Sequence, residues 1–185
     1  MKVVFLHGKS GSGKDTSFDY ICSKFNYKPY RLSAVLKTII SVISCEDVKH
    51  CYNNKKMIPK DMGSINWTLG EYHQKLGEAI RKVHTDIFIL SLWKTIKKSG
   101  DKCILITDVR HKNEYHFFKK AGAVSIRLTR PFDMRMKYLC GRDPYDISEV
   151  DLDDEKFDYE IDNYYETKNM LYSEIDKVFE KIHKK

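Results

Sequence analysis

The sequence predicts an α/β fold with a central, mostly parallel five-stranded sheet and helices on both faces, which makes three α/β/α layers. Five short apolar runs are typical of strands, and stretches with helical spacing separate most of them. The first run also passes directly into a glycine-rich loop and then a helix, which is how a βαβ unit begins. A length of 185 residues favours a single domain over residues 1–185.

The glycine-rich loop follows a strand predicted over Val3–Leu6, an unbroken apolar run that suits burial on both faces. Gly8-x-x-x-x-Gly13-Lys14 has the spacing of a phosphate loop. Glycines let successive N–H groups converge on phosphate oxygens, and the helix predicted over 15–25 adds its positive end. Lys14 supplies a full charge between the β- and γ-phosphates. The alternative is a flexible turn, which requires strand, spacing, lysine and helix to coincide by chance.

Asp15 departs from the common motif, in which a serine or threonine directly follows the lysine and holds Mg2+. Thr16 comes next instead, and this lysine-x-threonine order is seen in nucleoside monophosphate kinases. The Asp15 carboxylate either holds a metal-bound water or caps the helix. The sequence leaves both interpretations open.

A second carboxylate, Asp108, ends the apolar strand predicted over 103–108. In a protein with a phosphate loop this is the Walker B pattern, which places a carboxylate at the carboxyl edge of the sheet, where Mg2+ needs an anchor. Arg110 follows two residues later, close enough in sequence to clamp a phosphate in a bidentate manner. A helix cap is the alternative role for Asp108.

The other elements follow from apolar periodicity. In chain order they are a strand over 27–32, helices over 34–43, 69–83, 86–98 and 113–120, strands over 124–128 and 157–161, and a helix over 169–181. Thr68 and Glu71 predict a capping box. The apolar stripe of the helix over 86–98 is predicted to be Ile87, Leu90, Trp93 and Ile96. Residues 45–66 are polar and lack a clean period, so an irregular insertion is expected there.

The net charge of +7 suggests polyanionic partners. Because the chain has no compact Lys/Arg cluster with interleaved aromatics, the basic residues are assigned to nucleotide phosphates and solvated surface rather than to specific nucleic-acid binding. Five cysteines without metal-ligand spacing indicate a reduced protein. With no apolar stretch of membrane length and no signal pattern, we expect a cytoplasmic location without a membrane role, in the host cytoplasm if the protein is viral.

The motifs occur in an order that resembles the phage-type deoxynucleoside monophosphate kinases, which are also found in large DNA viruses. They are Gly8 to Thr16, LSAVLK (32–37), LGEAIR (76–81), TDVRHKNE (107–114), Arg130-Pro131, Ser148-Glu149, Leu152-Asp153-Asp154 and Phe157 to Asn163. This resemblance covers most of the chain apart from 45–66. The animal-type phosphomevalonate kinases are similar too, because they share the Gly-Lys-Asp loop, a Leu-Ser-x-x-Leu-Lys segment and a Ser-Asp-Thr-Arg-type element.

The resemblance implies a P-loop kinase fold and reversible transfer of the ATP γ-phosphoryl group to a deoxynucleoside monophosphate, with Mg2+. The implied donor-site residues are Gly8, Gly11, Ser12, Gly13, Lys14, Asp15, Thr16 and, near the adenine, Asn163. The implied catalytic residues are Lys14, Asp108, Arg110 and Arg130, and the metal ligands are Asp15 and Asp108. Ser33, Lys37, Arg81 and Arg135 would bind the substrate. The insertion would lie near the acceptor, and residues 130–150 would form a closing lid.

The partners implied are ATP and a small phosphate-bearing acceptor, and a homodimer is compatible with the resemblance. A base slot would draw on Tyr30, Trp67, Tyr72, His73 and Gln74. Two alternatives stay open. One is transfer to a non-nucleotide phosphate of the phosphomevalonate type, and the other is a non-catalytic nucleotide-binding protein.

Overall fold

The computed structural model describes the whole chain except residues 45–46, 48–68, 139–143, 165–166 and 185. The predicted insertion over 45–66 and the Thr68 half of the capping box therefore lie outside the described residues, apart from Asp47. The chain forms two compact units, Met1–Arg31 with Ile96–Lys185, and Leu32–Thr95. The single domain over 1–185 stays a prediction.

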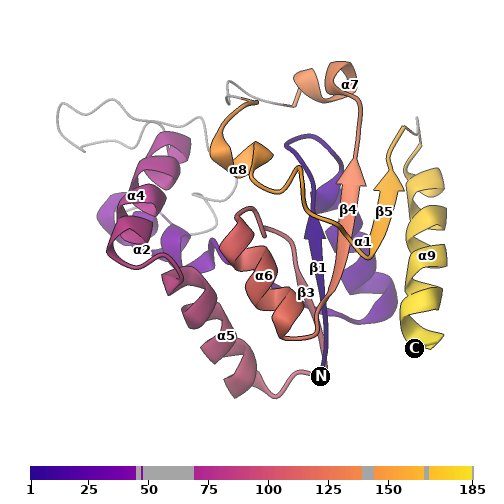
Figure 1. The fold of residues 1–185 in the computed structure, drawn as a ribbon, viewed down its shortest axis with the longest axis horizontal. Coiled ribbons are helices and arrows are strands. Elements are labelled where there is room, and N and C mark those ends of the chain that lie inside the picture. Colours follow the sequence, from indigo (N-terminus) through magenta and orange to yellow (C-terminus); the bar gives the residue numbers. More distant parts are fainter. Residues whose placement is uncertain (45–46, 48–68, 139–143, 165–166, 185) are drawn as a thin grey trace. The chain divides into compact units, whose positions relative to one another are not determined.

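The first unit contains one five-stranded sheet in which all neighbouring strands are parallel (Figure 1). The strands are β1 (Lys2–His7), β2 (Lys28–Tyr30), β3 (Cys103–Ile106), β4 (Val124–Thr129) and β5 (Tyr159–Asp162), in the order β2-β3-β1-β4-β5. β1 is central, so the loop that follows it lies at the carboxyl edge of the sheet between β3 and β4. Ligands of open parallel sheets bind at this edge.

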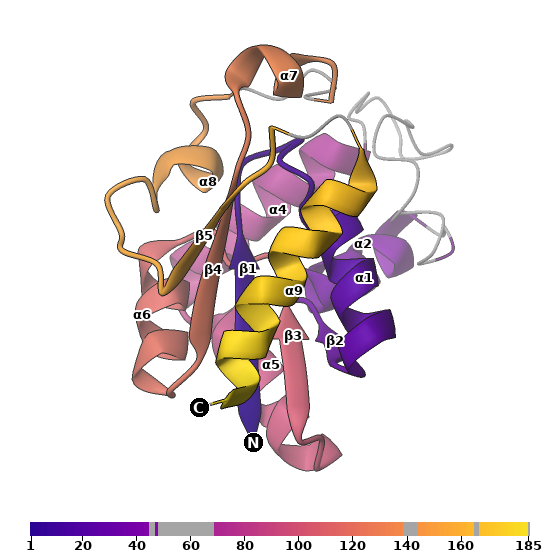
Figure 2. The same ribbon diagram turned by 90° about the vertical axis from the view of Figure 1, so that its right-hand side faces the viewer.

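Helices cover both faces of this sheet, which confirms the predicted three-layer fold. One face carries α1 (Lys14–Phe25) and α9 (Lys168–Lys184), and the other carries α6 (Lys112–Lys120) (Figure 2). Val4 and Leu6 of β1 lie in a buried cluster with the apolar residues of α1 and α9. Phe5 points the other way, and its ring lies 6.2 Å from that of Phe118 in α6. Successive side chains of β1 point to opposite faces of the sheet, and both faces are covered, which explains why the whole run Val3–Leu6 is apolar.

Two short helices lie at the carboxyl end of the sheet: α7 (Phe132–Met136) beyond the loop that follows β1, and α8 (Ile147–Val150) beside that loop (Figure 1). They belong to the segment over 130–150 that the sequence predicts as a lid. Asp146 caps α8, because its Oδ1 accepts the Ser148 N–H at 2.9 Å. The described part of the segment therefore contains helical turns, and its closure stays a prediction.

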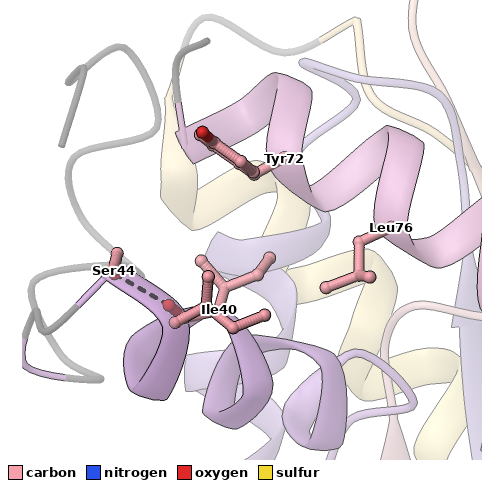
Figure 3. A pocket seen from close by; sticks show the side chains of 5 residues that line it. Ile40, Ser44, Tyr72 and Leu76 are labelled. Atoms are coloured by element: carbon pink, nitrogen blue, oxygen red, sulfur yellow. Dashed lines mark hydrogen bonds between the residues drawn. The ribbon is translucent and has the colours of Figure 1, made fainter. Parts of the chain in front are cut away.

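The second unit contains α2 (Ala34–Ser44), α4 (Leu69–Val83) and most of α5 (Ile87–Ser99). α2 and α4 approach closely at Gly77, where a Cβ atom would stand 3.2 Å from Leu36 Cδ2. A small apolar hollow lies between these helices, lined by Ile40, Ile43, Ser44, Tyr72 and Leu76 (Figure 3). Ser44 turns its hydroxyl back to the Ile40 carbonyl at 2.7 Å, which leaves the lining predominantly apolar.

The predicted apolar stripe of α5 is right in part. Ile96 is buried and Trp93 is half-buried as predicted, but Ile87 and Leu90 are 38% and 49% exposed, whereas Phe88, Ile89 and Leu92 are buried. The run from Ile87 to Trp93 is apolar at six of seven positions, so it offers more than one apolar face and periodicity cannot select the right one. Among the described residues, no helix is both long enough and apolar enough to cross a membrane.

Candidate functional site

The glycines of the loop adopt backbone conformations that other residues rarely reach. Gly13 is the N-cap of α1 with φ 98°, and Gly11 has φ 78°. A Cβ atom on Gly13 would lie 2.5 Å from Asn163 Nδ2, so a side chain at this position is excluded by space as well as by conformation. The loop is therefore built on glycine at the point where α1 begins.

Every backbone carbonyl from residue 8 to residue 13 accepts a hydrogen bond. Lys14 Nζ donates to the carbonyls of Gly8 and Lys9, Arg135 to Ser10, Arg130 to Gly11, Asn163 to Ser12, and the Ser17 N–H and hydroxyl to Gly13. Carbonyl oxygens repel an anion, and a donor bonded to each of them weakens that repulsion. This arrangement suits a phosphate site.

Three of the predicted residues thus donate hydrogen bonds to carbonyls of the loop. Arg135 is buried, and its Nη1 lies 3.1 Å from the Ser10 carbonyl while its Nε donates to the Arg130 carbonyl at 3.0 Å. Arg130 Nη1 lies 3.5 Å from the Gly11 carbonyl. Asn163 is buried and donates to the Ser12 carbonyl at 2.9 Å. These contacts assign a loop-supporting role, and contact with substrate or adenine stays a prediction for all three.

A buried carboxylate, Glu149 of α8, joins the loop to Arg110. Its Oε2 accepts the Ser10 N–H at 2.6 Å, and its Oε1 accepts both the Ser10 hydroxyl at 2.9 Å and Arg110 Nη1 at 2.8 Å. Only 3% of the Glu149 side chain is exposed, against 26% for Arg110. Glu149 therefore fixes one end of a guanidinium group whose remainder reaches the surface beside the loop.

Burial on its own would raise the pKa of Glu149. The charge of Arg110 and the hydrogen bonds from Arg110 and Ser10 outweigh burial and lower the pKa from 4.5 to about 2. Glu149 is consequently ionised at neutral pH, and its charge is matched locally. The backbone of Arg110 is held as well, because its N–H donates to the buried Glu114 Oε2 at 2.8 Å.

His7 ends β1 immediately before the loop. The ring is buried, stacks on Phe157 with centroids 5.3 Å apart, and contacts the Val109 carbonyl through Nδ1 at 3.0 Å. A carbonyl only accepts, so Nδ1 carries the proton. Burial lowers the pKa of His7 to about 4, the Val109 bond opposes this shift, and Lys14 and Arg127 reinforce it. A neutral His7 thus ties the end of β1 to the segment after β3.

The two predicted metal ligands lie in different surroundings. Asp108 is half-buried, two residues beyond the end of β3. Asp15 is 85% exposed on the first turn of α1, and its Oδ1 lies 3.5 Å from Arg31 Nη1. Among the described residues, no three acidic, histidine or cysteine side chains form a cluster that could hold a metal. Mg2+ in phosphoryl-transfer sites is commonly bound by one or two carboxylates plus substrate phosphates, and binding by Asp108 and Asp15 stays a prediction.

Three predicted acceptor residues, Ser33, Lys37 and Arg81, belong to the second unit. Lys37 is buried on α2, and its N–H donates to the Ser33 carbonyl at 3.0 Å. Arg81 lies on α4 with its guanidinium carbon 4.9 Å from the centre of the Phe88 ring. Their relation to the loop is a prediction, because the structure describes the two units separately.

The sequence did not single out Glu149, His7 or Glu114 as site residues. Glu149 lies in a motif that the resemblance includes, but nothing in its spacing indicates that it pairs with Ser10 and Arg110, which are remote in sequence. His7 precedes the glycine loop, and this position was the one available signal. In the Leu152-Asp153-Asp154 motif, Asp153 pairs with Lys9 of the loop at 2.7 Å, another contact between residues that are remote in sequence.

The comparisons with known proteins agree with this architecture. No family model matches the chain. A protein of Acanthamoeba polyphaga mimivirus named "Putative deoxynucleotide monophosphate kinase" is 24% identical over 147 residues, which are 71% of this chain and 75% of that protein. The dephospho-CoA kinase from Campylobacter jejuni superposes with a TM-score of 0.54 at 15% identity, over 98% of this chain and 97% of the other. The shikimate kinase from Aquifex aeolicus vf5 gives 0.56 at 14% identity, over 99% and 98%.

These similarities identify the fold. The chain has the three-layer α/β/α architecture of P-loop kinases, with the phosphate loop after the central strand. The structural neighbours named above carry different substrates in their names, so the shared fold does not select an acceptor.

Proposed function

We propose that this protein is a phosphotransferase that moves the γ-phosphoryl group of ATP to a nucleoside monophosphate, with a deoxynucleoside monophosphate favoured. The observation that carries the proposal is the loop from Gly8 to Gly13, in which every carbonyl is bonded to a donor. Such a loop suits the polyphosphate of a nucleoside triphosphate. The mimivirus relative supports the choice of acceptor through its name.

In this proposal the side chains position and stabilise phosphates rather than move protons. The acceptor phosphate has a second pKa of about 6, so it is largely dianionic at neutral pH and needs no strong general base. Lys14 and Arg110 would meet the charge that develops on the transferring group, and Glu149 would keep Arg110 in place. Asp108, with Asp15, would hold Mg2+, which when bound neutralises charge on the phosphates.

The proposal is tested by measuring ADP release from ATP with each of the four deoxynucleoside monophosphates in turn, and separately with phosphomevalonate. We expect turnover with at least one deoxynucleoside monophosphate. Turnover with phosphomevalonate alone would show that the proposed acceptor is wrong and that phosphoryl transfer from ATP is right. ATP binding without turnover of any acceptor would favour a non-catalytic nucleotide-binding protein instead.

A further inference from the structure

The buried hydroxyl groups of the protein fall into two sets. Six serine and threonine side chains in the described ranges are buried: Ser10, Ser12, Ser17, Ser44, Thr107 and Ser125. Four of them have partners, since Ser10 bonds Glu149, Ser17 bonds the Gly13 carbonyl, Ser44 bonds the Ile40 carbonyl and Ser125 bonds Asp158. The hydroxyls of Ser12 and Thr107 have no hydrogen-bond partner among the described residues.

Ser12 and Thr107 lie at the same edge of the sheet. Ser12 is in the phosphate loop, and Thr107 is the first residue beyond β3. In the register of the sheet Phe5 is opposite Ile106, so Thr107 continues alongside Leu6, two residues before the loop begins. The bond from His7 to the Val109 carbonyl keeps the two chains together beyond the strand ends. Among the described serine and threonine residues, both buried hydroxyls without a partner therefore lie where phosphate would bind.

The alternation of β3 indicates which way Thr107 faces. Leu105 belongs to the buried cluster with α1 and α9, and the next residue, Ile106, is buried outside that cluster. Because alternate residues of a strand share one face, Thr107 lies on the same side as Leu105, which is the side that α1 covers. α1 begins directly after the loop, with no side-chain cap among the described residues. Thr107 thus lies on the side of the sheet where the loop and the positive end of α1 are found.

A buried hydroxyl without a partner destabilises a folded protein, and valine would fill nearly the same volume without that cost. Such a group is explained when a ligand supplies the missing partner. We propose that the hydroxyl of Thr107 donates a hydrogen bond to a phosphate oxygen of the bound substrate. This rests on the proposed function only in that the substrate carries a phosphate, on either the donor nucleotide or the acceptor.

The test compares Thr107→Val with Thr107→Ser and with the control Ser125→Ala. Ser125 of β4 is also fully buried, but its hydroxyl has a partner, because it donates to Asp158 Oδ2 at 2.8 Å. Thermal denaturation without ligand gives the stability of each variant. Calorimetric titration with ATP, ADP, pyrophosphate and each deoxynucleoside monophosphate then gives the affinities.

We expect Thr107→Val to melt at the same temperature as the wild type or about 2–4 °C higher without ligand, because it loses an unsatisfied group. Its affinity for a phosphate-bearing ligand should fall about tenfold. Thr107→Ser should bind like the wild type. Ser125→Ala should melt lower and keep its affinities. A loss confined to ATP, ADP and pyrophosphate assigns the bond to the donor, and a loss confined to the monophosphates assigns it to the acceptor.

Four results would overturn the proposal: a lower melting temperature of ligand-free Thr107→Val, unchanged affinities of that variant, an equal loss of affinity in Thr107→Ser, or a wild type that binds none of these ligands. The proposed function fails separately. A wild type that binds ATP but phosphorylates no acceptor would end the kinase proposal, while the comparison of variants would still decide the role of Thr107.

Discussion

At the scale of single residues, the two lysines of the loop make different contacts. Lys14 Nζ lies between the carbonyls of Gly8 and Lys9, and Lys9 Nζ pairs with the exposed Asp153 at 2.7 Å. A charge inside the loop can meet a transferring phosphoryl group, whereas an exposed surface pair contributes little. Turnover should therefore depend on the side chain at position 14 and not on the side chain at position 9.

We expect Lys14→Ala to lower turnover by about two to three orders of magnitude, the size seen when one preorganised stabilising group is removed. Lys9→Ala, which keeps the backbone carbonyl, should retain turnover within about threefold. Steady-state ADP release measures both. Turnover of Lys14→Ala equal to that of Lys9→Ala would remove Lys14 from the site.

His7 makes the stability of the protein depend on pH. Its pKa is about 4 in the folded protein against 6.5 ordinarily, because the ring is buried. Between these values the unfolded chain binds a proton that folded His7 does not, so stability is full above pH 6.5 and declines as the pH falls toward 4, by up to about 3 kcal/mol.

Urea denaturation at a series of pH values measures this decline. In His7→Asn, whose amide retains a donor for the Val109 carbonyl, the slope between pH 6.5 and 4 should become markedly shallower. The matched control is His116→Asn, a position with a 61% exposed ring that should keep the wild-type slope. Equal slopes in the wild type and His7→Asn would show that another group titrates in this range.

At the scale of elements, α8 connects the loop to the segment after β3. Glu149→Gln removes the charge that pairs with Arg110 and replaces one accepting oxygen by a donor, so contacts to Ser10 and Arg110 cannot all be kept. We expect kcat to fall about tenfold or more with a much smaller change in KM for ATP, if Arg110 acts mainly in the transition state. The loss of stability should be about 1–3 kcal/mol.

Glu160→Gln is the control for this prediction. Glu160 is 53% exposed and lies 3.6 Å from Arg127, away from the loop contacts. Its kcat and stability should stay close to those of the wild type. Kinetics and denaturation are measured on both variants. If Glu149→Gln kept full kcat as Glu160→Gln does, α8 would not hold Arg110 in a catalytic position.

The elements also show what the sequence can and cannot predict. The helix over 69–83 was predicted with the bounds that the structure has, because its apolar spacing is regular. The strand over 27–32 is shorter, Lys28–Tyr30, since β2 is an edge strand that pairs only with β3. The contact of Glu149 with Ser10 depends on how remote parts of the chain fold together, and no local pattern contains that information.

At the scale of the whole molecule, the predicted donor residues lie in the first unit, and three of the four predicted acceptor residues lie in the second, with Arg135 the exception. The loop, Asp108, Arg110 and the residues that support the loop belong to the first unit, whereas Ser33, Lys37 and Arg81 belong to the second. The parallel five-stranded sheet could be predicted from the alternation of strands and helices, whereas the strand order β2-β3-β1-β4-β5 was not predicted. The prediction of the acceptor-binding residues depends more on the resemblance, because their motifs indicate no chemistry as specific as that of a phosphate loop.

This separation predicts that variants of the second unit affect the acceptor alone. Arg81→Ala should raise KM for the deoxynucleoside monophosphate about 10- to 100-fold, as expected for a lost arginine–phosphate interaction, and leave KM for ATP within about twofold. Because Arg81 also packs on Phe88, thermal denaturation must accompany the kinetics. The neighbouring exposed Lys82→Ala is the matched control and should change neither KM. If Arg81→Ala raised both constants equally, or neither, the residue would not be the acceptor's phosphate ligand.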